Sequence, residues 1–134
     1  MLKEERARKA EELFTGGYNC CQAVAAAFAD VTGLPTETVF RMSCPFGGGF
    51  ARTQNICGAV SGMGLIAGLV YGNDDPKCKL EMYPHIRSLT SKFEDQFGSI
   101  ICAELLRSKT KTCKDCVRTA AEILAEDLST HEHL

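Results

Sequence analysis

The sequence predicts an all-α fold, namely a single-domain bundle of about five to seven helices built around a glycine-rich central helix. Apolar residues recur at helical spacing, cap residues and glycine or proline breakers separate these periodic stretches, and no segment alternates polar and apolar residues as a strand does. Since 45% of the 134 residues are hydrophobic, the chain can bury a substantial core. We therefore expect residues 1–134 to form one domain, without internal repeats or low-complexity linkers.

The N-terminal part of the chain contains three predicted helices and one predicted loop. Residues 2–15 carry one apolar stripe and end at two glycines, which predicts a helix. Asn19 is a preferred N-cap and predicts a second helix that extends to about residue 30. Thr36 follows a proline and starts a short third helix over residues 37–42. Residues 44–50 contain a proline and three consecutive glycines, so we expect a flexible or tightly turned loop instead of regular structure.

The central helix is predicted over residues 57–71, with Asn55 as its cap. Residues 53–73 carry no formal charge, and glycines at 58, 62, 64, 68 and 72 recur at spacings that let another helix approach closely. One weakly hydrophobic segment in a small chain is more typical of the buried helix of a bundle than of a membrane span. We therefore expect no membrane insertion, and the glycine-lined face makes a homodimer a further expectation.

The remaining helices are delimited by clear start and stop signals. Pro84 lies inside the first of them and is expected to kink or split it. Gly98 ends that helix, and Ser99 is expected to cap the next one. Thr112 and Asp115 have the spacing of a capping box at the start of the last helix. The predicted C-terminal helices span residues 77–97, 99–106 and 113–127.

Composition and charge restrict the class of function. The net charge is -2 with a pI near 5.9, and the small basic cluster over residues 109–118 is typical of a solvated helix start, so we expect no nucleic-acid partner. Residues 1–10 are charged and lack the apolar core of a signal peptide, which favours a cytoplasmic localisation. In a reducing compartment, clustered cysteines are more often metal-binding or catalytic than disulfide-bonded.

Four of the eight cysteines follow closely after residues that favour helix N-caps. These pairs are Asn19 with Cys20, Asn55 with Cys57, Ser99 with Cys102, and Thr112 with Cys113. A helix N-terminus presents unpaired N–H groups and about half a positive charge, which favours thiolate over thiol. If these helix starts converge in space, the fold holds sulfur in the form that binds metals and performs redox chemistry.

Two local motifs strengthen this interpretation. The sequence Cys113-Lys-Asp-Cys116 is a C-x-x-C motif at a helix start, typical of metal binding or dithiol exchange, although two ordinary exposed cysteines would fit the same spacing. Cys57 precedes Gly58 and Gly62, so the first helical turn is bare and another group can approach the sulfur closely. A helix-packing groove with an inert cysteine would explain this second pattern equally well.

The other cysteines are less informative. Cys20 and Cys21 are adjacent and point to different sides of their helix, so at most one of them is expected to face a common site. Cys44 is expected to be a loop thiol that can reach the site, and Cys78 to be incidental.

The glycine run and the histidines carry weaker signals. Gly47 and Gly48 could form a nest of backbone N–H groups for an anion or for the sulfurs of a cluster, or simply let the loop pass close to a helix. No strand precedes them, so no nucleotide site is expected. His85 is expected to be structural or exposed, and His131 and His133 to lie in a frayed tail.

The order and spacing of these motifs resemble the redox-active protein family named for its C, G-C-A-x-x-G, C, C cysteine pattern. The matching segments are Phe14, Gly17-Tyr18-Asn19-Cys20, residues 46–49, residues 57–62, Phe93, Phe97-Gly98, Cys102, and Cys113 with Cys116. The resemblance covers nearly the whole chain and implies that Cys20, Cys57, Cys102 and Cys116 are the four characteristic cysteines. It implies that Cys113 is an extra partner or the alternative fourth, and Cys21 stands where the family more often has a small residue.

The resemblance implies a redox or metal-binding role and does not decide between an oxidoreductase and an electron-transfer protein. In one interpretation an iron–sulfur cluster is held by thiolate ligands, with Gly47, Gly48 and Gly58 beside it. The metal ligands are then Cys20, Cys57, Cys102 and Cys116. In the other, Cys113 and Cys116 exchange as a dithiol and Cys57 or Cys102 is the substrate-facing or resolving thiol. The electron donor or acceptor would be an unidentified redox partner protein.

Two further functions fit the same residues. A structural zinc site with four cysteine ligands would contribute to folding without redox chemistry. Alternatively, the chain is a non-enzymatic adaptor for a membrane transporter or another partner, and its cysteines are passive. Covalent haem is not expected, because the sequence contains no C-x-x-C-H motif.

Overall fold

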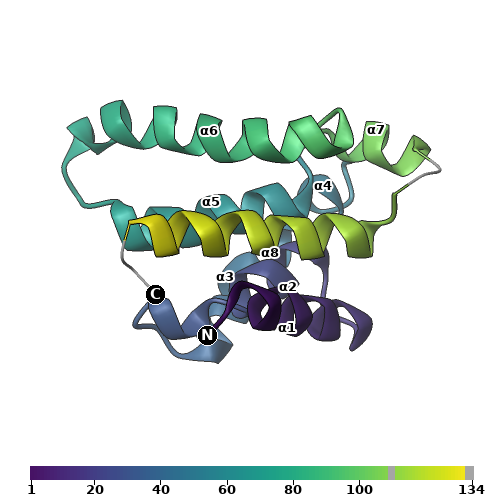
Figure 1. Cartoon of the computed structure of the whole chain (residues 1–134), viewed down its shortest axis with the longest axis horizontal. Helices are drawn as coiled ribbons and strands as arrows, with labels where there is room; N and C mark the ends of the chain where they lie inside the picture. The colour runs from purple at the N-terminus through teal and green to yellow at the C-terminus, as the bar shows by residue number, and fades with distance from the viewer. Residues whose placement is uncertain (109–110, 132–134) are drawn as a thin grey trace.

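The computed structural model describes residues 1–108 and 111–131 (Figure 1). Within this range the chain forms seven α-helices of six or more residues and no β-strand, so the predicted all-α fold is confirmed. These helices are α1 (Lys3–Thr15), α2 (Cys20–Ala26), α3 (Thr36–Ser43), α5 (Gly58–Tyr71), α6 (Lys79–Phe97), α7 (Cys102–Arg107) and α8 (Cys113–Thr130). The predicted residues Lys109 and His133 lie outside the described residues.

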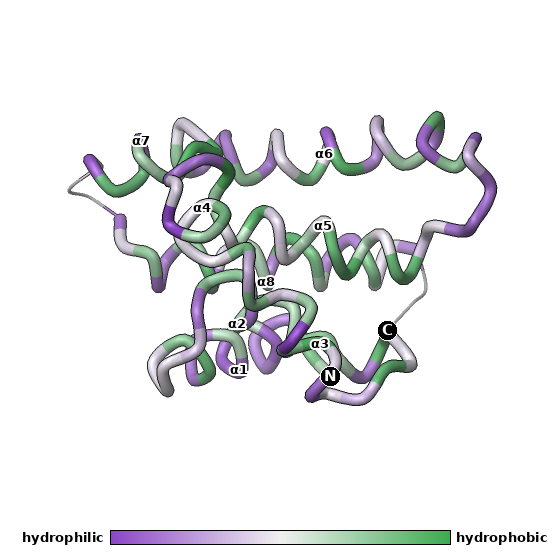
Figure 2. Tube along the Cα trace, turned by 180° about the vertical axis from the view of Figure 1, so that it is seen from behind, coloured by the Kyte–Doolittle hydropathy of each residue, from purple (hydrophilic) through white to green (hydrophobic). Residues whose placement is uncertain are grey.

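The helices are arranged in three layers (Figures 1 and 2). α5 and α8 run side by side through the middle. α1 and α2 pack against them on one side, and α6 runs along the other side. Of the 19 residues in α6, only Leu89 and Phe93 are buried, and Figure 2 shows hydrophobic and hydrophilic turns alternating along it. Within the described residues, no helix combines the length and hydropathy that a membrane span requires.

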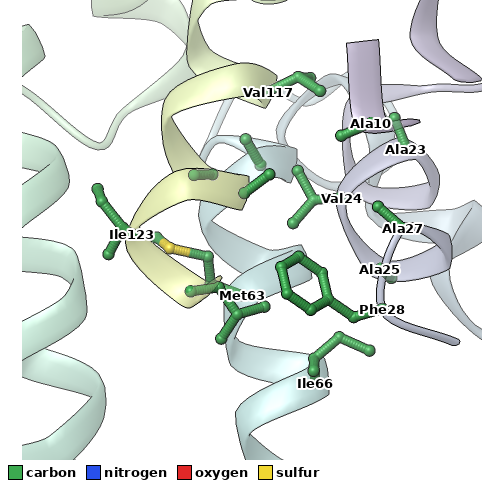
Figure 3. Packing of buried hydrophobic residues seen from close by; sticks show 14 of the residues in the cluster. Ala10, Ala23, Val24, Ala25, Ala27, Phe28, Met63, Ile66, Val117 and Ile123 are labelled. Atoms are coloured by element: carbon green, nitrogen blue, oxygen red, sulfur yellow. The ribbon is translucent and has the colours of Figure 1, made fainter. Parts of the chain in front are cut away.

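The core forms where α2, α5 and α8 meet. Val24 of α2 and Phe28, which follows that helix, pack with Met63 and Ile66 of α5 and Val117 of α8, and all five side chains are essentially inaccessible to solvent (Figure 3). Burying side chains of this size contributes about 1.5–3 kcal/mol each to folding. The core therefore fixes the relative positions of three of the four helices whose starts form the candidate site.

The glycine spacing of α5 serves this packing within the chain. A Cβ atom at Gly62 would lie only 2.9 Å from Val24 Cβ, so glycine lets α2 approach α5 closely. At Gly64 and Gly68 an added Cβ would meet no atom within 4 Å. One part of the predicted close-approach face is thus occupied by α2, while the other part is open.

The second predicted helix is shorter than expected. It ends at Ala26, and the chain continues as the 3-10 helix η1 (Ala29–Val31). The buried Arg6 guanidinium donates to Ala27 O at 2.8 Å, which occupies a carbonyl that a continuing helix needs. Arg6 also binds both carboxylate oxygens of Asp30, one of them at 3.0 Å through Nη2, and thereby ties α1 to η1.

The region around the glycine run is more ordered than the predicted loop. It forms the 3-10 helix η2 (Cys44–Phe46) and the short segment α4 (Gly47–Phe50). α4 is not a right-handed helix, because positive φ angles run from Gly48 through Arg52. The expectation of irregular structure is therefore wrong for residues 44–46, whereas the expectation of a tight turn holds for the glycines.

Candidate functional site

Five cysteines line one cavity at the end of the bundle where α2, α5, α7 and α8 begin. This cavity, here called the cysteine pocket, has a volume of about 450 Å³ and contains Cys20, Cys57, Cys102, Cys113 and Cys116 in its wall. The wall of the cavity also contains the apolar side chains of Phe14 and Leu105 and the polar side chains of Arg52 and Gln54. The predicted convergence of cysteines from distant parts of the chain is therefore present.

Two of the cysteines are positioned by caps that local sequence predicts. Cys20 is the first residue of α2, and the Asn19 side chain accepts a hydrogen bond from the Gln22 N–H at 2.9 Å in a complete capping box. Cys113 is the first residue of α8, where Thr112 and Asp115 form a second capping box. These caps fix the directions in which both helices start.

The other two predicted caps are wrong, although their cysteines do lie at helix starts. Cys57 itself occupies the N-cap position of α5, while the Asn55 side chain bonds within its own turn. α7 begins at Cys102, and Ser99 accepts a hydrogen bond from the Ile101 N–H before the helix starts. Neither helix has a side-chain cap of the predicted kind.

A pairing of distant segments replaces these caps. Ile56 and Ile101 form an isolated antiparallel β-bridge, and each is followed directly by a pocket cysteine. The Cys57 N–H donates to Ile100 O at 2.8 Å across the same junction. In this antiparallel pairing Cys57 lies opposite Ile100 and Cys102 lies opposite Asn55, so the bridge joins the starts of α5 and α7, although 45 residues of sequence separate the two cysteines.

Gly58 admits a sulfur atom from another helix. A Cβ atom at this position would lie 2.3 Å from Cys20 Sγ and 3.0 Å from Phe46 O. The bare first turn that the sequence predicts is thus occupied by Cys20, a second cysteine of the pocket. This contact brings the first residue of α2 against the first residue of α5.

A left-handed turn forms another part of the wall. Phe50, Ala51 and Arg52 have φ angles of 75°, 52° and 61°, although left-handed backbone costs a non-glycine residue roughly 1–2 kcal/mol. The turn carries Arg52 to the pocket, and a Cβ at Gly49 would lie 2.7 Å from Cys102 Cβ. Such strain persists only where the surrounding contacts impose it, and it is concentrated at functional sites.

The predicted glycines differ in their relation to the pocket. Gly48 and Gly58 line it, and the Gly48 N–H donates to the Cys20 thiol. Gly47 is not in the wall and lies against Asn19, where an added Cβ would be 2.4 Å from the Asn19 Cγ. The glycine run therefore contributes one N–H donor to a sulfur and also lets the turn pack closely on α2.

The pKa values of four pocket thiols are raised, contrary to the expectation of stabilised thiolates. Burial is the main cause that raises the pKa values of Cys20, Cys102 and Cys113. The pKa of Cys57 is raised chiefly by its hydrogen bond with the Cys116 side chain and then by burial. N–H groups at the helix starts lower the pKa values of Cys20 and Cys57, but their effect is smaller.

The pocket offers more cysteine ligands than a single metal centre requires. A structural Zn²⁺ ion takes four ligands, and iron–sulfur clusters are held by cysteine thiolates. The five cysteines of the wall therefore form a donor set that suits either group.

The remaining cysteines lie outside the pocket wall. Cys21 is fully buried in the interior, so it is Cys20 of the adjacent pair that lines the pocket. Cys44 is exposed and Cys78 is half-buried, and all eight cysteines are free thiols. Arg52, Gln54 and Leu105 were not predicted as site residues, because their only local signal is that they follow the glycine run or Cys102.

The comparisons with known proteins identify one family. A family model described as "Putative redox-active protein (C_GCAxxG_C_C)" matches residues 18–127, a range that includes all five cysteines of the pocket. No curated protein and no solved structure matches the chain significantly.

Proposed function

Because the chain belongs to the C_GCAxxG_C_C family, whose description is of redox-active proteins, we propose that the cysteine pocket holds an iron–sulfur cluster and transfers electrons. The observation that carries this proposal is the convergence of five cysteines on one cavity of about 450 Å³. Cysteine thiolates are the usual ligands of iron–sulfur clusters, and a bound cluster supplies one-electron transfer.

The donor set of the pocket fits such a group. The proposed ligands are Cys20, Cys57, Cys102 and Cys116, of which the last three are buried. Cys113 is exposed at the same wall and is the alternative fourth ligand. Ligation requires deprotonated sulfur, so these residues release their protons to solvent when they bind iron.

The surroundings of the sulfurs would offset the negative charge of a thiolate-bound cluster. Backbone N–H groups of Gly48 and Ala59 donate to Cys20 and Cys57, respectively. Arg52 brings a positive side chain to the wall, while Phe14 and Leu105 limit the access of water. Hydrogen bonds to sulfur, nearby charge and solvent exclusion are the means by which proteins adjust cluster potentials.

A thiol–disulfide centre is the second candidate. The interaction of the buried Cys57 and Cys116 side chains favours it, because Cys116 is the largest cause of the raised pKa of Cys57 and both residues line the same pocket. Their oxidation would form one S–S bond and release two protons, with two electrons passing to a disulfide of a partner protein. The C-x-x-C pair Cys113 and Cys116 is the other dithiol that fits this role.

Anaerobic purification followed by iron, sulfide and zinc determination tests the proposal. We expect the wild-type protein to contain iron and acid-labile sulfide and to absorb visible light. Cys102→Ser should abolish this absorption, whereas Cys44→Ser should retain it, because Cys44 is exposed and outside the pocket. A colourless protein with stoichiometric zinc would overturn the proposal in favour of a structural site.

Two other outcomes would also contradict a cluster. A metal-free protein with an oxidisable dithiol that requires Cys57 and Cys116 would establish the thiol–disulfide centre. A protein that contains no metal and no oxidisable dithiol, and that keeps its fold in Cys102→Ser and Cys57→Ser, would favour the adaptor function. In either case anaerobic reconstitution with iron and sulfide should fail to produce visible absorption.

A further inference from the structure

A second group of metal-binding side chains lies at the opposite end of α8. His85 of α6, Asp127 of α8 and His131 each offer one ligand atom, and these atoms all lie within 4.8 Å of one another. Figure 1 shows the end of α8 beside the end of α5 and close to the first half of α6. Cys116 and Asp127 are eleven residues apart on the same helix, which corresponds to about 16 Å along its axis, so this group is separate from the cysteine pocket.

Helical geometry explains how the three residues meet. Asp127 and His131 are four residues apart, so they lie on one face at the end of α8. His131 does not belong to a frayed tail as predicted, because its Nδ1 donates to Asp127 O at 2.8 Å. Its ring lies 5.3 Å from that of His85 and 5.5 Å from that of Tyr71, measured between centroids. Packing thus orients both imidazoles around the carboxylate.

The carboxylate at the centre is buried and surrounded by donors. Asp127 is 6% exposed, and His85 Nε2 lies 2.9 Å from each of its two oxygens. The Tyr71 hydroxyl donates to Asp127 Oδ2, also at 2.9 Å. A buried carboxylate in the fold requires such partners, since leaving its charge unpaired would cost several kcal/mol.

We propose that His85, Asp127 and His131 bind a divalent transition-metal ion of the zinc class. Two imidazoles and one carboxylate form a donor set that suits Zn²⁺, Fe²⁺, Co²⁺ and Ni²⁺. The Tyr71 hydroxyl has the position of an outer hydrogen-bond donor that orients a ligating carboxylate. The ion would replace the proton that His85 Nε2 now donates to the Asp127 carboxylate, and His131 Nδ1 would exchange its hydrogen bond with the Asp127 backbone oxygen for a bond to the ion.

The space beside the group allows the coordination to be completed. A cavity of about 430 Å³ adjoins it and is also lined by Ser88, Lys92 and Thr130. With three protein ligands, a tetrahedral ion keeps one position for water or an external ligand. Lys92 is the nearby positive charge in this wall, and Glu126 is paired with Lys3 at 3.3 Å. The competing interpretation is a metal-free hydrogen-bonded cluster that ties α6 to α8.

Anaerobic titration with Co²⁺ separates the two interpretations. Ligand-field absorption reports any bound Co²⁺, and near-ultraviolet charge transfer reports thiolate ligands. Co²⁺ bound by His85, Asp127 and His131 should therefore show ligand-field absorption without thiolate charge transfer. We expect His131→Ala to weaken this binding by at least about tenfold. His131 is half-exposed, so the variant should fold. Lys92→Ala, which changes the same cavity without removing a ligand, should bind Co²⁺ at least as tightly as wild type.

The same titration can overturn the proposal. If wild type binds Co²⁺ only with thiolate charge transfer, or if His131→Ala and Asp127→Asn both bind as wild type does, the group is a hydrogen-bonded anchor. Cys102→Ser should leave the thiolate-free absorption unchanged, because Cys102 lies in the other cavity. A failure of the iron–sulfur proposal is therefore distinguishable from a failure of this one.

Discussion

Replacing Gly58 with alanine tests whether Cys20 packs against the first turn of α5. The added Cβ would lie 2.3 Å from Cys20 Sγ, 3.0 Å from Phe46 O and 3.1 Å from Cys21 N. Atoms in favourable contact are roughly 3.5–4.0 Å apart, so the sulfur must move by more than about 1 Å. Rotation of the Cys20 side chain can relieve the first contact, but the two contacts with backbone atoms remain.

The expected loss of stability follows from these contacts. Overpacking in a close-packed region costs about 1–3 kcal/mol, and the higher helix propensity of alanine returns at most about 1 kcal/mol. We therefore expect Gly58→Ala to lower the free energy of unfolding by about 1–2 kcal/mol. Gly64→Ala is the matched control in the same helix, because its Cβ meets no atom within 4 Å. It should raise that free energy by roughly 0.5–1 kcal/mol.

Urea unfolding monitored by circular dichroism measures both variants. Because the substitution displaces Cys20, Gly58→Ala should also increase the rate at which a thiol reagent modifies this residue, whereas Gly64→Ala should not. The reasoning is refuted if Gly58→Ala unfolds at the same urea concentration as Gly64→Ala, or at a higher one. In that case Cys20 would not be held against α5, and the glycine would have another explanation.

Two further variants probe the contacts that hold the helices in place. Thr112→Ala removes the cap of α8 and should lower the free energy of unfolding in urea by about 1 kcal/mol. Thr112→Ser keeps the hydroxyl group and should leave this free energy unchanged. Equal stability of the wild type and both variants would exclude a stabilising cap. Hydrogen bonds from Arg6 lower the pKa of Asp30 below its ordinary value of 3.8. The Arg6–Asp30 pair therefore stabilises the fold above pH 3.8, and this contribution is lost as the pH falls through the folded-state pKa of Asp30. The stability difference between wild type and Asp30→Asn should therefore shrink in acid, and a pH-independent difference would contradict this.

Local sequence signals predicted most of the fold. The caps at Asn19 and Thr112 and the stop at Gly98 depend on a few neighbouring residues, and the structure contains all three. The positions of cysteines at helix starts were also predictable, whereas their convergence in space was a hypothesis that only the tertiary structure could decide. The caps, the stop and the cysteines at helix starts are local in origin, so the pattern of residues is sufficient to identify them.

The features that sequence analysis missed arise from contacts between distant segments. Asn55 and Ser99 have the residue types of caps, but the bridge between Ile56 and Ile101 determines how α5 and α7 begin. The left-handed conformation of Ala51 contradicts its local preference and is imposed by the turn around it. Asp127 is a further example. Its local sequence is that of an exposed helix position, but its contact with His85 of α6 accompanies burial of the side chain.

The raised pKa values of Cys20 and Cys102 show how a local and a global effect compete. Placing a thiolate at a helix N-terminus stabilises it by about 0.3–1 kcal/mol, and by up to about 2 kcal/mol where the site is partly buried. Removing a charge from water costs several kcal/mol, and neighbouring thiolates repel one another. Burial therefore prevails at Cys20 and Cys102, and their pKa values are raised. A metal cation can displace protons from buried thiols and supply the positive charge that the thiolates otherwise lack. The raised pKa values of Cys20 and Cys102 are therefore compatible with the proposed role of these sulfurs as ligands.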